Sequence, residues 1–386
     1  MTMNAQKILI LGSTGSIGTS ACNCVRRFRD DFTITGLGAG SNVDLLAEQI
    51  KEFGPKHAYI ADPQKASILN ERFGSGVIIY KGDDELERIA QEADYDILLN
   101  ALVGAAGFRP TVIALKRGKK VALANKESLV IGGDYITTLI KNDKHRLMPV
   151  DSEHSAILQC LGSCDANETV ESLILTASGG PFRNLPKDEF SKITAAQALK
   201  HPTWAMGKKI TIDSSTLMNK GFEIIEAHHL FSLPYSKLRV CVHPQSIIHS
   251  IVEFYDGSQI AQLGLPDMEL PIQYALTWPK RLPISGKRLS LPEIGKMEFF
   301  EPDFDRFPCL RLCIEAGEIG GTAPAVVNAA NEVAVDLFLR GKIGFTGISE
   351  IAAQALRNHK PHKADSVEVI EQTDRETRRE IIKKRG

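Results

Sequence analysis

The sequence predicts an α/β protein with an N-terminal Rossmann-like, doubly wound parallel sheet, a central α+β catalytic domain and a C-terminal helical bundle. Short apolar runs alternate with helical stretches over residues 1–150, strand-like runs follow one another over 151–278, and helical periodicity dominates 309–386. Alternation of strands and helices is typical of parallel sheets, whereas consecutive strands favour a more open α+β sheet. Residues 279–308 are proline-rich without clear periodicity, so we expect an ordered linker there.

The predicted elements follow this order along the chain. In the first domain the strand-like runs are residues 7–12, 32–40, 57–62, 76–82, 96–102 and 119–125. In the second domain they are 171–180, 208–215, 239–244, 246–258 and 259–264. Four helical stretches end the chain, at 309–321, 322–341, 347–359 and 366–386.

Composition limits the possible functions. The chain has 386 residues, 43% of them hydrophobic and 24% charged, with a formal net charge of -1. A net charge so close to zero gives the chain no general reason to bind nucleic acid. The longest apolar runs are shorter than the ~20 residues that span a bilayer, so we expect no membrane association. The N-terminus lacks the features of a signal peptide, which favours the cytoplasm. Seven cysteines without a C-x-x-C pair indicate buried thiols.

A glycine-rich turn follows the first strand. The sequence GSTGSIG places Gly12, Gly15 and Gly18 between a strand and a helix. Such glycines permit a sharp turn, close approach to a pyrophosphate and tight packing of the helix on the sheet. This pattern predicts a dinucleotide site.

The end of the second strand favours NADP over NAD. An NAD site usually carries an acidic residue there, whereas this chain has Gly38-Ala39-Gly40-Ser41-Asn42 and no carboxylate before Asp44. Because the acid is missing, a 2′-phosphate is not repelled. An obvious cationic partner is missing too, so we expect donors from Ser41 and Asn42, with Arg26 or Arg27 as nearby cations.

Two acidic residues follow the strand-like run at 147–150. In an extended segment Asp151 and Glu153 project to the same side, and converging carboxylates repel unless a cation lies between them. Oxygen ligands suit Mg²⁺ or Mn²⁺. The alternative is a helix N-cap at Ser152 with an acidic first turn.

A polar helix face lies between residues 216 and 231. Asn219, Lys220 and Glu223 share that face at helical spacing, after a strand predicted to end at residues 213–216. Asn219, Lys220 and Ser214 offer the donors that a phosphate monoester requires, and Glu223 offers a third carboxylate. A simple surface ion pair between Lys220 and Glu223 is the alternative.

Three further segments fit a phosphorylated substrate. The run ending in Ser178-Gly179-Gly180 exposes backbone N–H groups to an anion. The segment LKHPTWAMGKK indicates a lid that carries His201, Trp204 and Met206, unless Trp204 simply anchors the loop to the core. Asn125, Lys126 and Glu127 follow a strand, at the sheet edge where ligands bind.

Six motifs carry a resemblance to a known family: GSTGSIG, ALANKES, PVDSEHSA, TASGGPF, HPTWAMGKKITIDSSTLMNKGFEIIEAHHLF and HPQSIIHSIVEF. Together they resemble the 1-deoxy-D-xylulose 5-phosphate reductoisomerase family over essentially the whole chain. The resemblance implies an NADPH- and divalent-metal-dependent rearrangement and reduction of a small phosphorylated sugar, which yields 2-C-methyl-D-erythritol 4-phosphate in isoprenoid precursor biosynthesis. It also implies a homodimer, for which residues 245–265 are plausible interface material.

The resemblance assigns roles to residues. Metal ligands for Mg²⁺, Mn²⁺ or Co²⁺ are implied at Asp151, Glu153 and Glu223. Catalytic roles are implied at Lys126, Glu153 and His201. Substrate contacts are implied at Lys126, Ser152, Glu153, Ser178, His201, Trp204, Met206, Ser214, Asn219, Lys220 and Glu223. NADPH contacts are implied at Thr14, Gly15, Ser16, Ile17, Gly40, Ser41, Asn42, Asn125, Glu127 and Gly207. Many members of the family have Lys or Arg at the position of Ser41, so this chain departs from the family in its contact with the 2′-phosphate.

Two other functions remain open from the residues alone. One is a simple NADP-dependent dehydrogenase of the semialdehyde or homoserine type, which would not need three converging carboxylates. A non-catalytic NADP-binding regulator keeps the glycine turn without the acidic residues and phosphate donors.

Overall fold

The computed structural model describes residues 5–204, 206–284 and 286–385. The sequence predicts that the N-terminal segment is not a signal peptide. Residues 1–4, which begin that segment, lie outside the described residues. The chain forms two compact units. The first unit comprises Met1–Asn125, Thr138–Asp151 and Met268–Ser285, and the second comprises Lys126–Thr137, Ser152–Asp267 and Gly286–Gly386. The domain limits at residues 150, 278 and 308 remain predictions.

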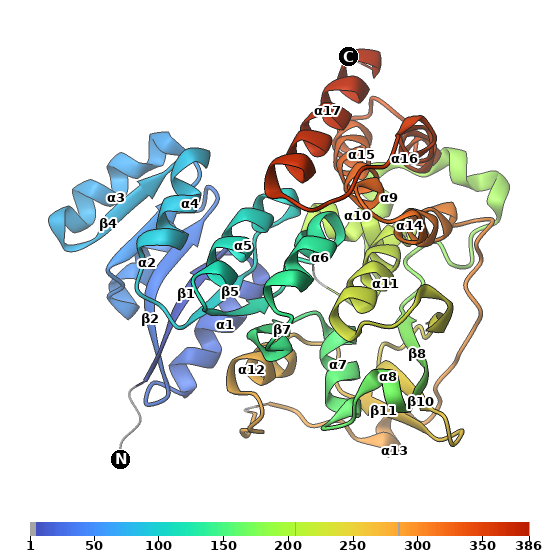
Figure 1. The fold of residues 1–386 in the computed structure, drawn as a ribbon, viewed down its shortest axis with the longest axis horizontal. Helices are drawn as coiled ribbons and strands as arrows, with labels where there is room; N and C mark the ends of the chain where they lie inside the picture. Colours follow the sequence, from blue (N-terminus) through green and yellow to red (C-terminus); the bar gives the residue numbers. More distant parts are fainter. Residues whose placement is uncertain (1–4, 205, 285, 386) are drawn as a thin grey trace. The chain divides into compact units, whose positions relative to one another are not determined.

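The first unit contains a seven-stranded sheet in the order β4-β3-β2-β1-β5-β6-β7, in which every pairing is parallel (Figure 1). The strands are β1 Gln6–Leu11, β2 Phe32–Ala39, β3 His57–Ile60, β4 Ile78–Lys81, β5 Ile97–Asn100, β6 Lys120–Leu123 and β7 Leu147–Pro149. The helices are α1 Ser16–Arg27, α2 Val43–Phe53, α3 Ala66–Phe73, α4 Asp83–Glu92, α5 Phe108–Lys116 and α12 Glu269–Thr277, with the 3₁₀ turn η1 Pro63–Lys65. The predicted doubly wound sheet is confirmed.

Strand order fixes where this unit binds ligands. From β1 the chain moves outward through β2 to β4, and then returns to continue from β5 on the other side of β1. Because such crossovers are right-handed, α1–α3 cover one face of the sheet and α4 and α5 the other. The switch point lies between the carboxyl ends of β1 and β5, where open α/β sheets bind their ligands.

The second unit contains a four-stranded sheet in the order β11-β10-β8-β9 (Figure 1). The strands are β8 Val170–Ala177, β9 Leu238–Val242, β10 Ile248–Phe254 and β11 Gln259–Leu263. Strand β10 pairs antiparallel with β8 and β11, whereas β8 and β9 are parallel. The remaining helices are α6 Glu127–Leu139, α7 Ser152–Leu161, α8 Ala166–Thr169, α9 Ala195–Ala198, α10 Lys208–Thr216, α11 Met218–Phe231, α13 Leu291–Ile294, α14 Pro308–Ile319, α15 Ala323–Leu339, α16 Thr346–Asn358 and α17 Val367–Arg385.

The strand predicted at 208–215 is wrong, because these residues form helix α10. The apolar–polar alternation of KITID resembles a strand, but the segment buries Thr211, Ile212 and Asp213 together. The ammonium of Lys209 also lies 2.8 Å from the carboxylate of Asp213, an i,i+4 contact on one helix face. Tertiary contacts therefore outweigh the β propensity of the isoleucine and threonine residues.

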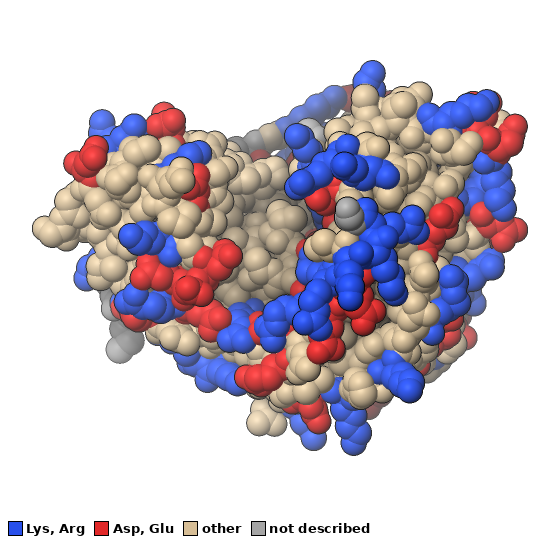
Figure 2. Space-filling model, turned by 90° about the horizontal axis from the view of Figure 1, so that it is seen from above, with Lys and Arg blue, Asp and Glu red and all other residues tan. Residues whose placement is uncertain are grey.

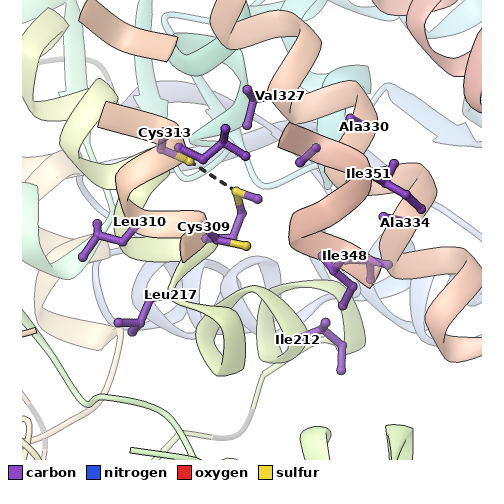
Figure 3. Packing of buried hydrophobic residues seen from close by; sticks show 14 of the residues in the cluster. Ile212, Leu217, Cys309, Leu310, Cys313, Val327, Ala330, Ala334, Ile348 and Ile351 are labelled. Atoms are coloured by element: carbon purple, nitrogen blue, oxygen red, sulfur yellow. Dashed lines mark hydrogen bonds between the residues drawn. The ribbon is translucent and has the colours of Figure 1, made fainter. Parts of the chain in front are cut away.

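The helical C-terminal region is confirmed, and its helices share a core with the central part of the chain. Figure 3 shows Cys309 and Cys313 of α14 among Leu217, Val327 and neighbouring apolar side chains. The Cys313 thiol lies 3.2 Å from the sulfur of Met218. All seven cysteines are free thiols, but the expected burial holds for only four of them, because Cys160 and Cys241 are half-buried and Cys164 is exposed. Burial raises the pKa of Cys309 to about 12, so its thiolate is disfavoured.

Lys and Arg side chains are interspersed with Asp and Glu on the face drawn in Figure 2. Within the described ranges, no helix is both long and apolar enough to cross a lipid bilayer. The segment 279–308 contains the short helix α13, and its Phe300 pairs with Val242 at the β9 edge.

Candidate active site

The turn between β1 and α1 forms an anion cradle in the first unit. Gly12 has φ +87°, and a Cβ there would lie 2.3 Å from the Ala101 carbonyl oxygen, so a side chain is excluded. A Cβ at Gly18 would lie 2.2 Å from the Gly12 oxygen. Helix α1 begins after Gly15 with no side-chain cap and no acidic residue in its first turn. Its first N–H groups therefore face the turn where a pyrophosphate binds.

Several residues predicted to contact the cofactor lie in or near this turn. Thr14 and Gly15 are in the turn, Ser16 and Ile17 begin α1, and Gly40 and Ser41 follow β2. Asn42 caps α2, because its side-chain oxygen accepts from the Leu45 N–H at 3.2 Å.

The cations suggested for the 2′-phosphate have other partners. Arg26 binds Glu52 through two contacts of 2.6 Å, and Arg27 is paired with Glu269. The expectation that Arg26 or Arg27 assists Ser41 is therefore not supported by their geometry.

An asparagine pair orders the loop after β5. The Asn125 amide donates to the carbonyls of Leu102 and Gly104, each at 2.9 Å, and Asn100 donates to the Gly107 carbonyl at 2.7 Å. Asn100 is fully buried at the end of β5, and our sequence analysis did not select it. Asn100 could have been selected from the sequence because it is an amide at the end of a strand next to the switch point.

Two of the three carboxylates predicted as metal ligands lie close together in the second unit. Carboxylate oxygens of Glu153 and Glu223 lie within 4.8 Å of each other, and Asp151 is the last residue of the first unit. The backbone differs from the extended segment we expected, because β7 ends at Pro149 and Glu153 lies in the first turn of α7. The helical alternative therefore describes the backbone, yet Glu153 and Glu223 still meet.

Two lysines neutralise this cluster. The Lys220 ammonium lies 2.8 Å from Glu153 and also contacts Glu223, and the Lys126 ammonium lies 2.9 Å from Glu223. Asn219 donates to the same Glu223 carboxylate. Lys220 and Glu223 are 3% and 1% exposed, so this is not a solvated surface pair. Burial by itself would lower the pKa of Lys220, but Glu153 and Glu223 outweigh burial and raise it above the ordinary value.

A second acidic group adjoins the first. Ligand atoms of His154 and Glu226 in the second unit also lie within 4.8 Å of each other, and both residues are buried. His154 Nε2 lies 2.8 Å from the main-chain oxygen of Glu223, which can only accept, so Nε2 carries the proton. His154 and Glu226 were not selected from sequence; the i,i+3 spacing of Glu223 and Glu226 is the available signal.

Three of the side chains predicted to contact the substrate, those of Ser178, His201 and Ser214, lie together in the second unit. His201 Nε2 lies 3.1 Å from both the Ser178 and the Ser214 hydroxyls. His201 Nδ1 accepts the N–H groups of Thr203 and Trp204, at 3.1 and 2.9 Å, so Nε2 is the protonated nitrogen. Burial lowers the pKa of His201, which keeps the ring neutral near pH 7. Gly180 adds its N–H beside Ser178, and a Cβ there would lie 2.8 Å from the Ser214 carbonyl oxygen.

The predicted lid is an irregular segment between α9 and α10. Trp204 lies beside His249, with ring centroids 6.3 Å apart, and Trp204 and Met206 are half-buried. Gly207 ends the segment and caps α10.

A buried ion network holds the helix after the lid. Lys209 lies 2.5 Å from Glu127 and 2.8 Å from Asp213, whose other oxygen accepts from Asn331 at 2.8 Å. Burial opposes the charge of Glu127, but Lys209 lowers its pKa overall. The sequence did not indicate a role for Lys209, because a lysine in a predicted strand is expected to be exposed to solvent.

Comparison with known proteins gives one consistent result. Family models described as 1-deoxy-D-xylulose 5-phosphate reductoisomerase and its C-terminal domains match residues 8–133, 147–231 and 263–380. A reductoisomerase of that name from Chloroherpeton thalassium is 52% identical over 380 residues, covering 98% of each chain. One from Caldanaerobacter subterraneus is 51% identical, covering 98% of this chain and 99% of the relative.

Solved structures agree with these matches. The reductoisomerase from Zymomonas mobilis in complex with NADPH is 42% identical, with a TM-score of 0.89 and 97% of each chain covered. A reductoisomerase structure in complex with NADPH, fosmidomycin and magnesium is 38% identical, with a TM-score of 0.92 and 98% of each chain covered.

Proposed function

This chain belongs to the 1-deoxy-D-xylulose 5-phosphate reductoisomerase family, and from that premise we propose that Asp151, Glu153 and Glu223 bind the divalent cation of the reaction. The reaction is the NADPH- and metal-dependent rearrangement and reduction of 1-deoxy-D-xylulose 5-phosphate to 2-C-methyl-D-erythritol 4-phosphate, a step of isoprenoid precursor biosynthesis. One observation carries the metal assignment: carboxylate oxygens of Glu153 on α7 and Glu223 on α11 lie within 4.8 Å of each other, and Asp151 precedes Glu153 by two positions in the chain.

The donor set fits a hard divalent cation. All three groups are carboxylates, which suit Mg²⁺ and Mn²⁺, whereas the neighbouring group containing His154 offers a nitrogen that already faces Glu226 at 3.4 Å. Three carboxylates and the ammoniums of Lys126 and Lys220 leave a formal charge of one minus (−3 + 2). A divalent cation therefore turns the cluster positive, which suits an anionic substrate.

The bound groups supply the difficult chemistry and the chain supplies position and charge. When bound, the cation supplies Lewis-acid stabilisation of oxygen anions, and NADPH supplies the hydride. Glu153 belongs to the carboxylate cluster and Lys126 contacts its Glu223, so we assign proton handling to Lys126 and Glu153. Ser152 supports this role because its hydroxyl donates to Glu153 at 2.5 Å.

The substrate phosphate binds the neutral donors. We assign it to Ser178, Ser214 and His201 Nε2, with Asn219 and Lys220 on the neighbouring face of α11. Neutral donors bind a phosphate dianion strongly because each hydrogen bond is charge-assisted. Trp204 and Met206 of the lid then exclude water from the reacting carbons, and Gly207 connects the lid to α10.

The glycine turn binds NADPH. We assign the pyrophosphate to the α1 N-terminus at Gly15, Ser16 and Ile17, beside Thr14. The remaining cofactor contacts are assigned to Gly40, Ser41, Asn42, Asn125, Glu127 and Gly207.

Titration of the purified protein with Mn²⁺ tests the metal assignment. We expect Glu223→Gln to weaken Mn²⁺ binding by on the order of 100-fold or more and to abolish turnover. Glu350→Gln, an exposed change on α16, is the matched control and should bind like the wild type. Because Glu223 is buried against two lysines, the half-buried Asp151→Asn provides a second variant if Glu223→Gln is unstable. Unchanged Mn²⁺ affinity in both variants would exclude these ligands.

We also propose that two copies of the chain associate through the β11 edge. Strand β11 is the last strand of its sheet, and its Ile260 side chain is 48% exposed. An exposed edge with apolar side chains favours pairing with another strand. Sedimentation analysis should give a dimer for the wild type and a monomer for Ile260→Lys; a monomeric wild type contradicts the proposal.

The cellular setting we propose is the cytoplasm, without membrane or nucleic-acid partners. Free thiols at all seven cysteines are typical of a reducing compartment. Cell fractionation with an antibody to the protein tests this; recovery in the membrane fraction contradicts it.

A further inference from the structure

The chain carries no basic side chain in the loop where an NADP-binding site usually meets the 2′-phosphate. Residues 40–42 are Gly, Ser and Asn, and Asn42 is occupied as the cap of α2. Arg26 and Arg27 are held by Glu52 and Glu269. The cation that binds the 2′-phosphate must therefore come from another element.

The loop after β3 lies directly against the loop after β2. Strands β2 and β3 pair in parallel up to Ala39 and Ile60. Beyond them, the Ala61 N–H donates to the Ala39 carbonyl at 3.0 Å and the Asp62 N–H donates to the Gly40 carbonyl at 3.2 Å. Two backbone bonds thus fix the start of η1 beside the β2–α2 loop within the same unit.

Lys65, at the end of η1, reaches across to this loop. Its ammonium donates to the Ser41 carbonyl at 2.6 Å. An ammonium has three N–H donors, and the Ser41 carbonyl takes one of them. The side chain is 37% exposed, so the ammonium remains accessible to a ligand over Ser41.

Neighbouring charges leave Lys65 as the effective cation. Asp62 lies 3.9 Å from Lys65, and one of its oxygens already accepts from the Gln64 N–H at 3.1 Å. Arg72 lies 3.2 Å from Asp44, the first acidic residue after β2, so each charge offsets the other. The Gly40 position is open, with no atom within 4 Å of a Cβ placed there.

We propose that Lys65 binds the 2′-phosphate of NADPH and so supplies the cation that the β2–α2 loop lacks. The inference rests on the proposed use of NADPH by this chain. It makes the β3–η1 turn, rather than the β2–α2 loop alone, a determinant of cofactor specificity. Ser41 then contributes its backbone carbonyl as the anchor that orients the ammonium.

Calorimetric titration of the full chain with NADPH and with NADH tests the proposal. We expect Lys65→Ala to weaken NADPH binding about tenfold or more, as loss of a charged hydrogen bond does, and to leave NADH binding within about twofold. Lys65→Arg should keep NADPH binding near the wild-type value. Lys51→Ala, which removes the same charge from the exposed opposite end of α2, should change neither cofactor.

Salt provides a second readout. In the wild type, the preference for NADPH over NADH should shrink as ionic strength rises from about 0.05 to 0.5 M, and Lys65→Ala should lose most of that dependence. Lys65→Met keeps the side-chain stem without the charge and must reproduce Lys65→Ala.

Three results would overturn the assignment or its premise, and they are distinguishable. Equal NADPH affinity in the wild type and both uncharged variants removes Lys65 from the site. Equal weakening of NADPH and NADH assigns Lys65 a structural role in the loop instead. A wild type that binds NADH but not NADPH refutes the cofactor assignment itself, independently of Lys65.

Discussion

The Lys220 ammonium lies 2.8 Å from Glu153 and contacts Glu223, so a buried cation of the protein itself lies between two of the carboxylates that we propose as metal ligands. Under that proposal the lysine and a divalent cation compete for the same oxygens. Metal binding would then make the ammonium available to an anionic ligand and so link metal binding to substrate binding.

Lys220→Met should separate these two roles. Removing the ammonium leaves Glu153 and Glu223 without this partner, so Mn²⁺ affinity should be unchanged or tighter. The KM for the phosphorylated substrate should rise about tenfold or more, because a charged hydrogen bond is lost. Metal titration and steady-state kinetics measure the two effects. Lys342→Met, at an exposed position, is the control; weaker Mn²⁺ binding with unchanged KM contradicts the competition.

Lys209→Met should destabilise the protein at neutral pH. The variant leaves Glu127 and Asp213 buried without their ammonium, which typically costs ~3–5 kcal/mol of unfolding free energy. Urea unfolding measures the difference, and the adjacent exposed Lys208→Met is the control. A loss no larger than that of Lys208→Met would show that the network is not stabilising.

The loss of stability caused by Lys209→Met should depend on pH. The folded-state pKa of Glu127 is lowered, so its ionised form stabilises the protein above the ordinary pKa of about 4.3, and this stabilisation is lost as pH falls through the lowered value. The stability gap between wild type and variant should therefore shrink below about pH 4. A gap that is constant from pH 7 to about pH 3 contradicts this sign.

His201→Ala should raise the KM for substrate about tenfold, because Nε2 no longer donates beside Ser178 and Ser214. His201→Gln, which retains an N–H donor, should recover part of the loss. Because burial lowers the pKa of His201, the ring is neutral at pH 7, and KM should not improve through its protonation down to about pH 6.5. Steady-state kinetics over this range measure both effects.

Gly221→Ala should impair the enzyme by displacing α11. A Cβ there would lie 2.5 Å from Cβ and 2.6 Å from Sγ of Cys313, a residue of α14 visible in the packed core of Figure 3. Overpacking of this kind costs ~1–3 kcal/mol and shifts the backbone. The midpoint temperature of thermal unfolding and kcat should both fall. Gly344→Ala, where a Cβ meets no atom within 4 Å, is the control.

The sequence by itself determined the parallel sheet, the glycine turn and the residue types of the site. The strands are short, buried apolar runs bounded by turn residues, and Asp151, Glu153, Asn219, Lys220 and Glu223 occur in segments whose chemistry is readable locally. The family motifs extend along the chain, so the activity followed from sequence as well.

Only the tertiary structure decided which charges pair and which backbone carries them. Residues 208–216 have the pattern of a strand, but helix α10 forms because Lys209, Asp213 and Ile212 find buried partners on segments distant in the chain. Lys65 and Ser41 are separated by 24 positions and meet only because β2 and β3 are adjacent in the sheet. Charge pairing depends on through-space distance, which local periodicity does not encode.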